Sequence, residues 1–289
     1  MKTKETVSPE KTKTRVYFLA SEDVKSLAKL PLGNFITKLV QEEKESTKEG
    51  KLTVAFYQGQ GQIKKLVLAG VGSLQTDGAT KLRTIAGTVA RTLAADKTGG
   101  KAEVLTSFAL TPEYLTAIAQ GLSLGSYSYR ECKTDKDAPK PCEYTIVTTL
   151  PKAGHLVKQA EILTKNICLV RDWVNRPSNY LYPEVFANIV QDFAKELKLS
   201  CEILTKKDME KKKMGAILAV GQGSVHEPRM ITLKYQGAGK DQPYIAFVGK
   251  GVCFDSGGIS LKSGQGMGDM KDDMGGAGAV LGAIKTIAE

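Results

Sequence analysis

Lysines and aspartates lie among many glycines in one stretch of the chain, residues 248–276. Lys250 and Asp255 directly follow the apolar run 244–248, which is typical of a buried strand. The glycines around them let the backbone turn sharply. Because open α/β sheets bind their ligands at the carboxyl ends of the strands, this is a place where a functional site is expected.

Two more aspartates, Asp272 and Asp273, fall just before or within the first turn of a predicted helix, 277–287. Carboxylates and a lysine that converge from a strand end and a helix start favour a divalent cation site, since Mg²⁺, Mn²⁺ and Zn²⁺ all accept carboxylate oxygen. A lysine joins such a site only as the neutral amine, because an ammonium group has no lone pair. Lys262 could instead stay charged and stabilise a developing oxyanion. The alternative is a solvated loop with ordinary charges.

The motifs in this stretch resemble those of a known family. The string Val-Gly-Lys-Gly-Val-x-Phe-Asp-Ser-Gly-Gly-Ile-Ser-Leu-Lys, followed by Met-Lys-x-Asp-Met-Gly-Gly-Ala, is similar to the signature of the leucine aminopeptidases, the cytosolic two-metal aminopeptidases. The resemblance implies two divalent ions, zinc or manganese, with Lys250, Asp255 and Asp273 as ligands. It implies that Lys262 polarises the substrate carbonyl. Met270 would line the pocket for the N-terminal side chain of a peptide substrate.

The sequence departs from the family pattern at three positions near these residues. Cys253 replaces the usual Thr, Ser263 a common Pro, and Gly278 a common Ala. None of the three is an expected ligand. Asp269 and Asp272 would be neighbours of the metal site and not ligands.

A second family motif does not occur in this sequence. In the family, the string Asn-Thr-Asp-Ala-Glu-Gly-Arg supplies an Asp and a Glu that hold both metals and an Arg that positions a bicarbonate base. Without it, the resemblance implies a C-terminally truncated member, either a fragment or half of a split protein. We therefore expect little or no peptidase activity from the chain alone, because two-metal hydrolysis needs both ions. The family forms hexamers, so a homo-oligomer is expected if the fold is completed.

Other catalytic interpretations have less support. Ser256 in Asp-Ser-Gly-Gly is similar to a serine protease nucleophile, but the two histidines, His155 and His226, give no evidence of a triad. The Gly249-Lys250 pair lacks the spacing of a phosphate-binding loop.

The rest of the chain predicts an α/β fold. Short apolar runs alternate with helical patterns in the first half, which favours an N-terminal α/β domain, 1–152, with a mostly parallel sheet. The stripe of apolar residues in 153–176 predicts a connecting helix. Residues 177–289 are expected to form the first part of a doubly wound α/β aminopeptidase catalytic domain. The predicted strands are 16–20, 52–57, 66–71, 104–108 and 144–149, and the predicted helices include 81–95, 112–124 and 184–197.

Two further segments resemble landmarks of the family's catalytic domain. They are Asn-x-Pro-x-Asn-x-x-x-Pro at 175–183 and the Met-Gly-Ala-Ile-Leu-Ala-Val-Gly-Gln-Gly-Ser string at 214–224. The resemblance therefore extends from 175 to 289, and covers the N-terminal part only by its domain plan.

Composition limits the classes of protein. A chain of 289 residues with 42% hydrophobic residues can build a real core. Its 5 cysteines are odd in number and form no CxxC pair, which argues against a disulfide framework or a structural zinc site. No apolar run is typical of a secretory signal or a membrane span, so we expect a cytoplasmic protein with no membrane partner.

The net charge of +10 raises nucleic-acid binding as an alternative function. The lysines, however, are scattered over both predicted domains, and the cluster at 206–213 favours one exposed helix without interleaved aromatic residues. We therefore expect no specific nucleic-acid partner. A non-catalytic remnant is the other alternative to a peptidase.

Overall fold

The computed structural model describes residues 1–6, 12–59, 61–96, 100–134, 138–140, 142–239 and 241–289. These residues form two compact units, Met1–Lys165 and Asn166–Glu289, which we call the N-terminal and C-terminal units. The long helix α4 (Ala153–Asn175) contributes residues to both. Among the described residues, no helix is long and apolar enough to span a membrane.

A single six-stranded sheet organises the N-terminal unit, in the order β1-β6-β5-β2-β4-β3. All neighbouring strands are parallel except β3 and β4, which pair in antiparallel fashion, so the sequence-based prediction of a mostly parallel sheet is confirmed. The strands are β1 (Lys2–Lys4), β2 (Thr14–Ala20), β3 (Leu52–Gly59), β4 (Gln62–Gly72), β5 (Gly100–Thr106) and β6 (Cys142–Val147).

Helices cover both faces of this sheet. Alternate side chains of β2 show why: Val16 and Phe18 enter one apolar cluster, while Tyr17 and Leu19 enter another. Helices α2 (Gly78–Ala95) and α3 (Pro112–Gly125), with the start of α4, pack against the first face. The 3₁₀ helix η1 (Ser21–Lys29) and α1 (Gly33–Glu42) cover the second.

The start of α3 follows the expected capping chemistry. Thr111 accepts a hydrogen bond from the Tyr114 amide through its hydroxyl, and Pro112 occupies the first turn. Proline is tolerated there because its missing N–H would have no partner inside the helix.

Glycines let α2 and α3 approach closely, and this gives a stability prediction. A Cβ at Gly121 would lie 2.2 Å from the Arg83 carbonyl oxygen, whereas one at Gly87 would meet nothing closer than 3.5 Å. We expect Gly121→Ala to lower the free energy of unfolding by about 1–3 kcal/mol through overpacking. Gly87→Ala, the matched control, should be neutral or slightly stabilising because alanine favours helix. Thermal unfolding followed by circular dichroism compares the two. Equal melting temperatures would contradict the prediction.

The C-terminal unit surrounds the chain's one tryptophan. Trp173 on α4 is 2% exposed and packs edge-to-face on Phe186 of α5 (Pro183–Glu196), with ring centroids 5.4 Å apart. Met274 and Leu281, at the start and in the middle of α8 (Gly275–Ala288), complete this cluster.

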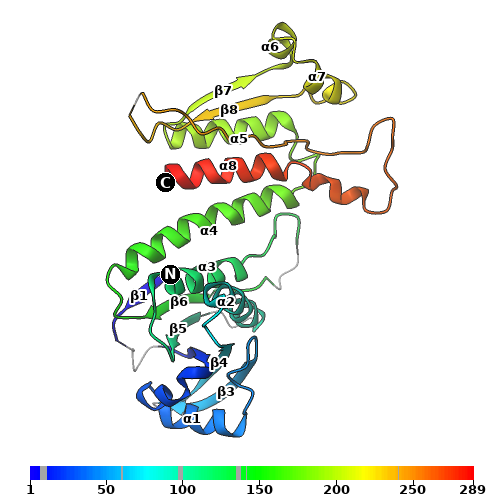
Figure 1. Cartoon of the computed structure of the whole chain (residues 1–289). Coiled ribbons are helices and arrows are strands. Elements are labelled where there is room, and N and C mark those ends of the chain that lie inside the picture. Colours follow the sequence, from blue (N-terminus) through cyan, green and yellow to red (C-terminus); the bar gives the residue numbers. More distant parts are fainter. Residues whose placement is uncertain (7–11, 60, 97–99, 135–137, 141, 240) are drawn as a thin grey trace. The chain divides into compact units, whose positions relative to one another are not determined.

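A two-stranded antiparallel sheet packs on the same cluster through Ile231 and Leu233. In Figure 1, α5 lies between this sheet and α8. The remaining elements of the unit are β7 (Ser200–Leu204), α6 (Lys206–Lys211), α7 (Gly215–Gly221), β8 (Met230–Lys234) and the 3₁₀ helix η2 (Met267–Asp272).

The predicted strand 244–248 is wrong. Residues 241–266 contain no helix or strand, and Ile245 and Val248 are 83% and 95% exposed. A strand is stable only beside another strand, and none of the described residues pairs with this run. The apolar run therefore appears as an extended, exposed segment that leads into the candidate site.

Candidate functional site

The candidate site is built on the loop 249–266, on η2 and on the start of α8, all within the C-terminal unit. Close packing of backbone holds Lys250 against the first turn of α8. The Lys250 carbonyl accepts a hydrogen bond of 2.7 Å from the Ala277 amide, and a Cβ at Gly249 would lie 2.5 Å from the Gly276 oxygen. Only glycine fits at such a contact. As a result, Lys250 lies next to Asp273, which follows η2 and is separated from α8 by Met274.

A tight turn brings Asp255 and Lys262 together. The Lys262 amide donates to the Ser256 carbonyl oxygen at 2.9 Å, which closes the loop between them. Gly257 has φ +89, and a Cβ there would lie 2.2 Å from the Ser260 oxygen, so this turn requires glycine. The Gly257 amide also donates to Asp255 Oδ1 at 2.8 Å and fixes the carboxylate.

The site contains two ion pairs that join lysine to aspartate. Lys250 Nζ lies 2.7 Å from Asp273 Oδ1, and Lys262 Nζ lies 3.1 Å from Asp255 Oδ2. The four side chains predicted from the sequence are thus paired across loop and helix. Each lysine of the site thus has an aspartate as its ion-pair partner.

Hydrogen bonds and charges shift the pKa of two of these groups. The Gly257 amide, and then Lys262, lower the pKa of Asp255 below its usual value. The hydrogen bond to Asp273 raises the pKa of Lys250. Both shifts favour the charged forms.

One carboxylate oxygen in the site has no partner. Asp273 Oδ2 is buried and accepts no hydrogen bond from any described residue, although Oδ1 of the same group is paired with Lys250. A buried, unpaired carboxylate oxygen is costly unless something positive meets it. The donor set therefore fits a divalent cation, which would give this oxygen a partner.

Histidine, cysteine and carboxylate side chains alone do not form a metal site here. Among the residues that the structure describes, no group of three or more of them is arranged to hold an ion.

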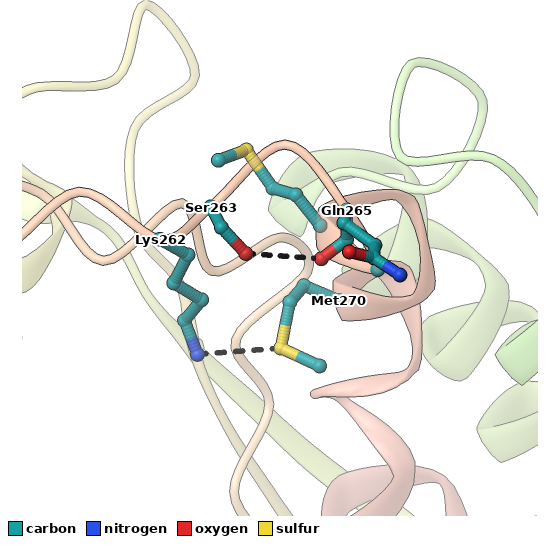
Figure 2. A pocket seen from close by; sticks show the side chains of 6 residues that line it. Lys262, Ser263, Gln265 and Met270 are labelled. Atoms are coloured by element: carbon teal, nitrogen blue, oxygen red, sulfur yellow. Dashed lines mark hydrogen bonds between the residues drawn. The ribbon is translucent and has the colours of Figure 1, made fainter.

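An open pocket of about 410 Å³ lies beside Lys262. Figure 2 shows Lys262 Nζ directed at Met270 Sδ, 3.3 Å away, and Ser263 Oγ donating to the Gln265 carbonyl oxygen at 3.2 Å. Its lining residues are Lys262, Ser263, Gln265, Gly266, Met267 and Met270. The predicted pocket residue Met270 thus lies next to the predicted catalytic lysine.

Sequence reasoning missed Met267 and Gln265 as pocket residues. Met267 and Met270 are three residues apart, which is one turn of the 3₁₀ helix, and this spacing could have identified Met267 as a pocket residue.

A hydrogen bond to the site loop was also not predicted from the sequence. Ser178, in the segment 175–183, donates to the Cys253 carbonyl oxygen at 3.0 Å. That bond ties a second sequence landmark to the site loop.

The cysteines differ in accessibility, which gives a labelling prediction. Burial raises the pKa of Cys142 and of Cys253 to about 11, whereas Cys132 is exposed. At pH 8 only about one thiol in a thousand is ionised at such a pKa, and the thiolate is the reactive form. N-ethylmaleimide should therefore modify Cys132 first and the other two last, as measured by peptide mass spectrometry. All three should react at similar rates in urea. Labelling of Cys253 as fast as Cys132 in the folded chain would contradict the prediction.

Comparisons with known proteins show similarity over both units of the chain. The model for the cytosol aminopeptidase family catalytic domain matches residues 168–289, and that for the family's N-terminal domain matches 17–136. A probable cytosol aminopeptidase of Geotalea uraniireducens is 37% identical over 261 residues, which is 86% of this chain and 52% of that protein. One of Alkaliphilus metalliredigens is 34% identical over 286 residues, covering 92% of this chain and 56% of the relative.

Solved structures show the same fold. A mutant of tomato leucine aminopeptidase superposes with a TM-score of 0.82 at 25% identity, covering 99% of this chain and 59% of that one. The bottromycin maturation enzyme BotP in complex with Mn gives a TM-score of 0.73 at 24% identity, over 96% of this chain and 56% of its own. The chain therefore spans about half the length of the curated relatives it matches.

Proposed function

The chain belongs to the cytosol aminopeptidase family, and we propose that its site loop supplies part of a two-metal centre that releases N-terminal, leucine-like residues from peptides. The observation that carries the proposal is the meeting of Lys250, Asp255, Lys262 and Asp273 in one place. We also propose the domain division 1–152, 153–176 and 177–289, and a cytoplasmic location like that implied by the relatives' name.

Three of these residues are suited to hold zinc or manganese. Asp255 and Asp273 offer carboxylate oxygens, one of them unpaired, and Lys250 offers an amine once its proton is lost. When bound, divalent ions supply Lewis acidity and a nucleophile derived from water at neutral pH. Lys250 must give up its contact with Asp273 to take part, because its ammonium form has no lone pair.

Lys262 is suited to a different task. Its Nζ lies 3.1 Å from Asp255 Oδ2 and donates a hydrogen bond of 3.3 Å to Met270 Sδ. Placed at the edge of the pocket, it would donate to the carbonyl oxygen of the first peptide bond and stabilise the charge that develops there. Met270 and Met267 give the pocket an apolar wall, which favours a leucine-like side chain.

The chain alone supplies few oxygen ligands. The site described here has two carboxylates, and the Asn-Thr-Asp-Ala-Glu-Gly-Arg string of the family does not occur in the sequence. Two ions held for hydrolysis need more ligands than these. We therefore propose that the chain by itself has little or no peptidase activity.

Hydrolysis of leucine 4-nitroanilide, together with Mn²⁺ titration, tests this function. The proposal expects Mn²⁺ to bind the purified chain, and expects Lys262→Met to keep that binding because Lys262 is not a ligand. Turnover by the chain alone that Lys262→Met removes would support the catalytic role and contradict the proposed inactivity. Absence of any Mn²⁺ or Zn²⁺ binding would contradict the metal centre itself.

A further inference from the structure

The edge strand β3 of the N-terminal unit is unprotected in an unusual way. Its residues, Leu52–Gly59, pair with β4 on one side only. Figure 1 shows β3 beside β4, at the edge of the six-stranded sheet. Among the described residues, no backbone hydrogen bond reaches β3 from a segment other than β4. Its other side therefore presents unpaired N–H and C=O groups.

The sequence of this edge lacks the features that normally block association. Residues 52–63 contain no charged residue and no proline, although 25% of the chain is charged. Natural sheets protect their edge strands with lysine, proline, bulges or short length, and β3 has an unbroken register of eight residues with β4. An edge of this kind is expected to be covered.

Side chains on one face of β3 are apolar and exposed. Val54 and Phe56 are 43% and 63% exposed, and Ile63 on β4 is 77% exposed on the same face. Single exposed apolar residues need no explanation, but Val54 and Phe56 lie side by side on the free edge strand and indicate a contact surface, whereas Ile63 lies one strand further in.

The register identifies which backbone groups face outward. The Gly70 amide donates to the Lys51 carbonyl oxygen, which marks these two residues as a hydrogen-bonded pair. Because hydrogen-bonded and non-bonded pairs alternate along an antiparallel ladder, the N–H and C=O groups of Val54 and Phe56 point away from β4.

We propose that β3 pairs with β3 of a second copy of this chain, antiparallel, around a two-fold axis through Ala55. This register places Val54 opposite Phe56 of the other copy twice, and such aromatic and β-branched cross-strand pairs stabilise sheets. It uses the outward-facing groups of both strands. Two chains of net charge +10 repel each other. Because β3 carries no charged residue, two copies can approach at this strand with less repulsion than elsewhere. This inference does not depend on the proposed peptidase function.

Sedimentation equilibrium of the full chain tests the pairing. We expect a concentration-dependent dimer that Phe56→Lys weakens about ten-fold or more, because the lost pair occurs twice. Ile63→Lys is the matched control, since it makes the same kind of change on the same face but on a strand that is not at the edge. It should leave the dissociation constant unchanged. A wild-type chain that stays monomeric, or equal weakening by both variants, would overturn the proposal.

Disulfide cross-linking tests the register independently. Ala55→Cys places two thiols at the axis in a non-hydrogen-bonded pair, where Cα atoms lie about 4.5 Å apart and a disulfide fits. Mild oxidation should give a covalent dimer above the wild-type background. Thr53→Cys, whose neighbour across the axis is Tyr57, should not cross-link. Equal cross-linking of the two variants would contradict this register.

Discussion

We expect Asp255→Ala to lower the affinity of the chain for Mn²⁺ and Zn²⁺ by about a hundred-fold or more. Asp255 is fixed by the Gly257 amide and lies 3.1 Å from Lys262, so its carboxylate is already held for a cation. Its removal also leaves Lys262 without a counter-ion. Isothermal titration calorimetry of the wild type and the variant measures the difference.

Asp272→Ala is the matched control for this prediction. Asp272 is exposed and adjacent in sequence to the proposed ligand Asp273, so its substitution removes the same charge from the same segment. We expect only a few-fold loss of affinity, because a solvent-exposed charge is screened. If both variants lose binding equally, general electrostatic attraction and not ligation explains the affinity.

We expect Phe186→Ala to lower the free energy of unfolding of the C-terminal unit by about 3–5 kcal/mol. Phe186 is 4% exposed and packs edge-to-face on Trp173, so its removal leaves a cavity in the cluster that supports α8. Trp173 is the only tryptophan, and its fluorescence therefore reports this unit during urea unfolding.

Phe247→Ala provides the control for that experiment. Phe247 lies in the same unit but is 62% exposed, so truncation should change stability by no more than about 0.5 kcal/mol. If the urea concentration at the midpoint of unfolding is as high for Phe186→Ala as for Phe247→Ala, the Trp173 cluster does not stabilise the unit.

The sequence predicts elements whose stability is local. Helix α3 is recognisable because Thr111 caps it, Pro112 fits its first turn, and its apolar residues repeat with helical spacing. The parallel strands β2 and β5 are recognisable as buried apolar runs between helices. These features depend on neighbours a few residues away, and a sequence shows those directly.

Elements that depend on distant partners could not be predicted in the same way. The run 244–248 has strand composition, but strand formation requires an adjacent strand that none of the described residues provides. The strands β7 and β8 pair with each other across a separation of some thirty residues, and neither has enough pattern to be recognised alone.

The sequence identified the four residues of the candidate site, but not which lysine pairs with which aspartate. The motif indicated Lys250, Asp255, Lys262 and Asp273, and these do meet. Which lysine contacts which aspartate depends on the turn at Gly257 and on the close packing of Gly249 against Gly276. Such backbone contacts are three-dimensional, so the spacing of charged residues does not reveal them.

Anomalous diffraction from crystals of the chain grown with Mn²⁺ tests the metal centre most directly. The account predicts an anomalous peak within coordination distance of Asp255, Asp273 Oδ2 and the Lys250 amine, with the Lys250–Asp273 ion pair opened. Lys262 should remain near Met270 and outside the coordination sphere. A peak elsewhere, or both ion pairs intact in crystals that contain Mn²⁺, would contradict the proposal that these residues hold the metal.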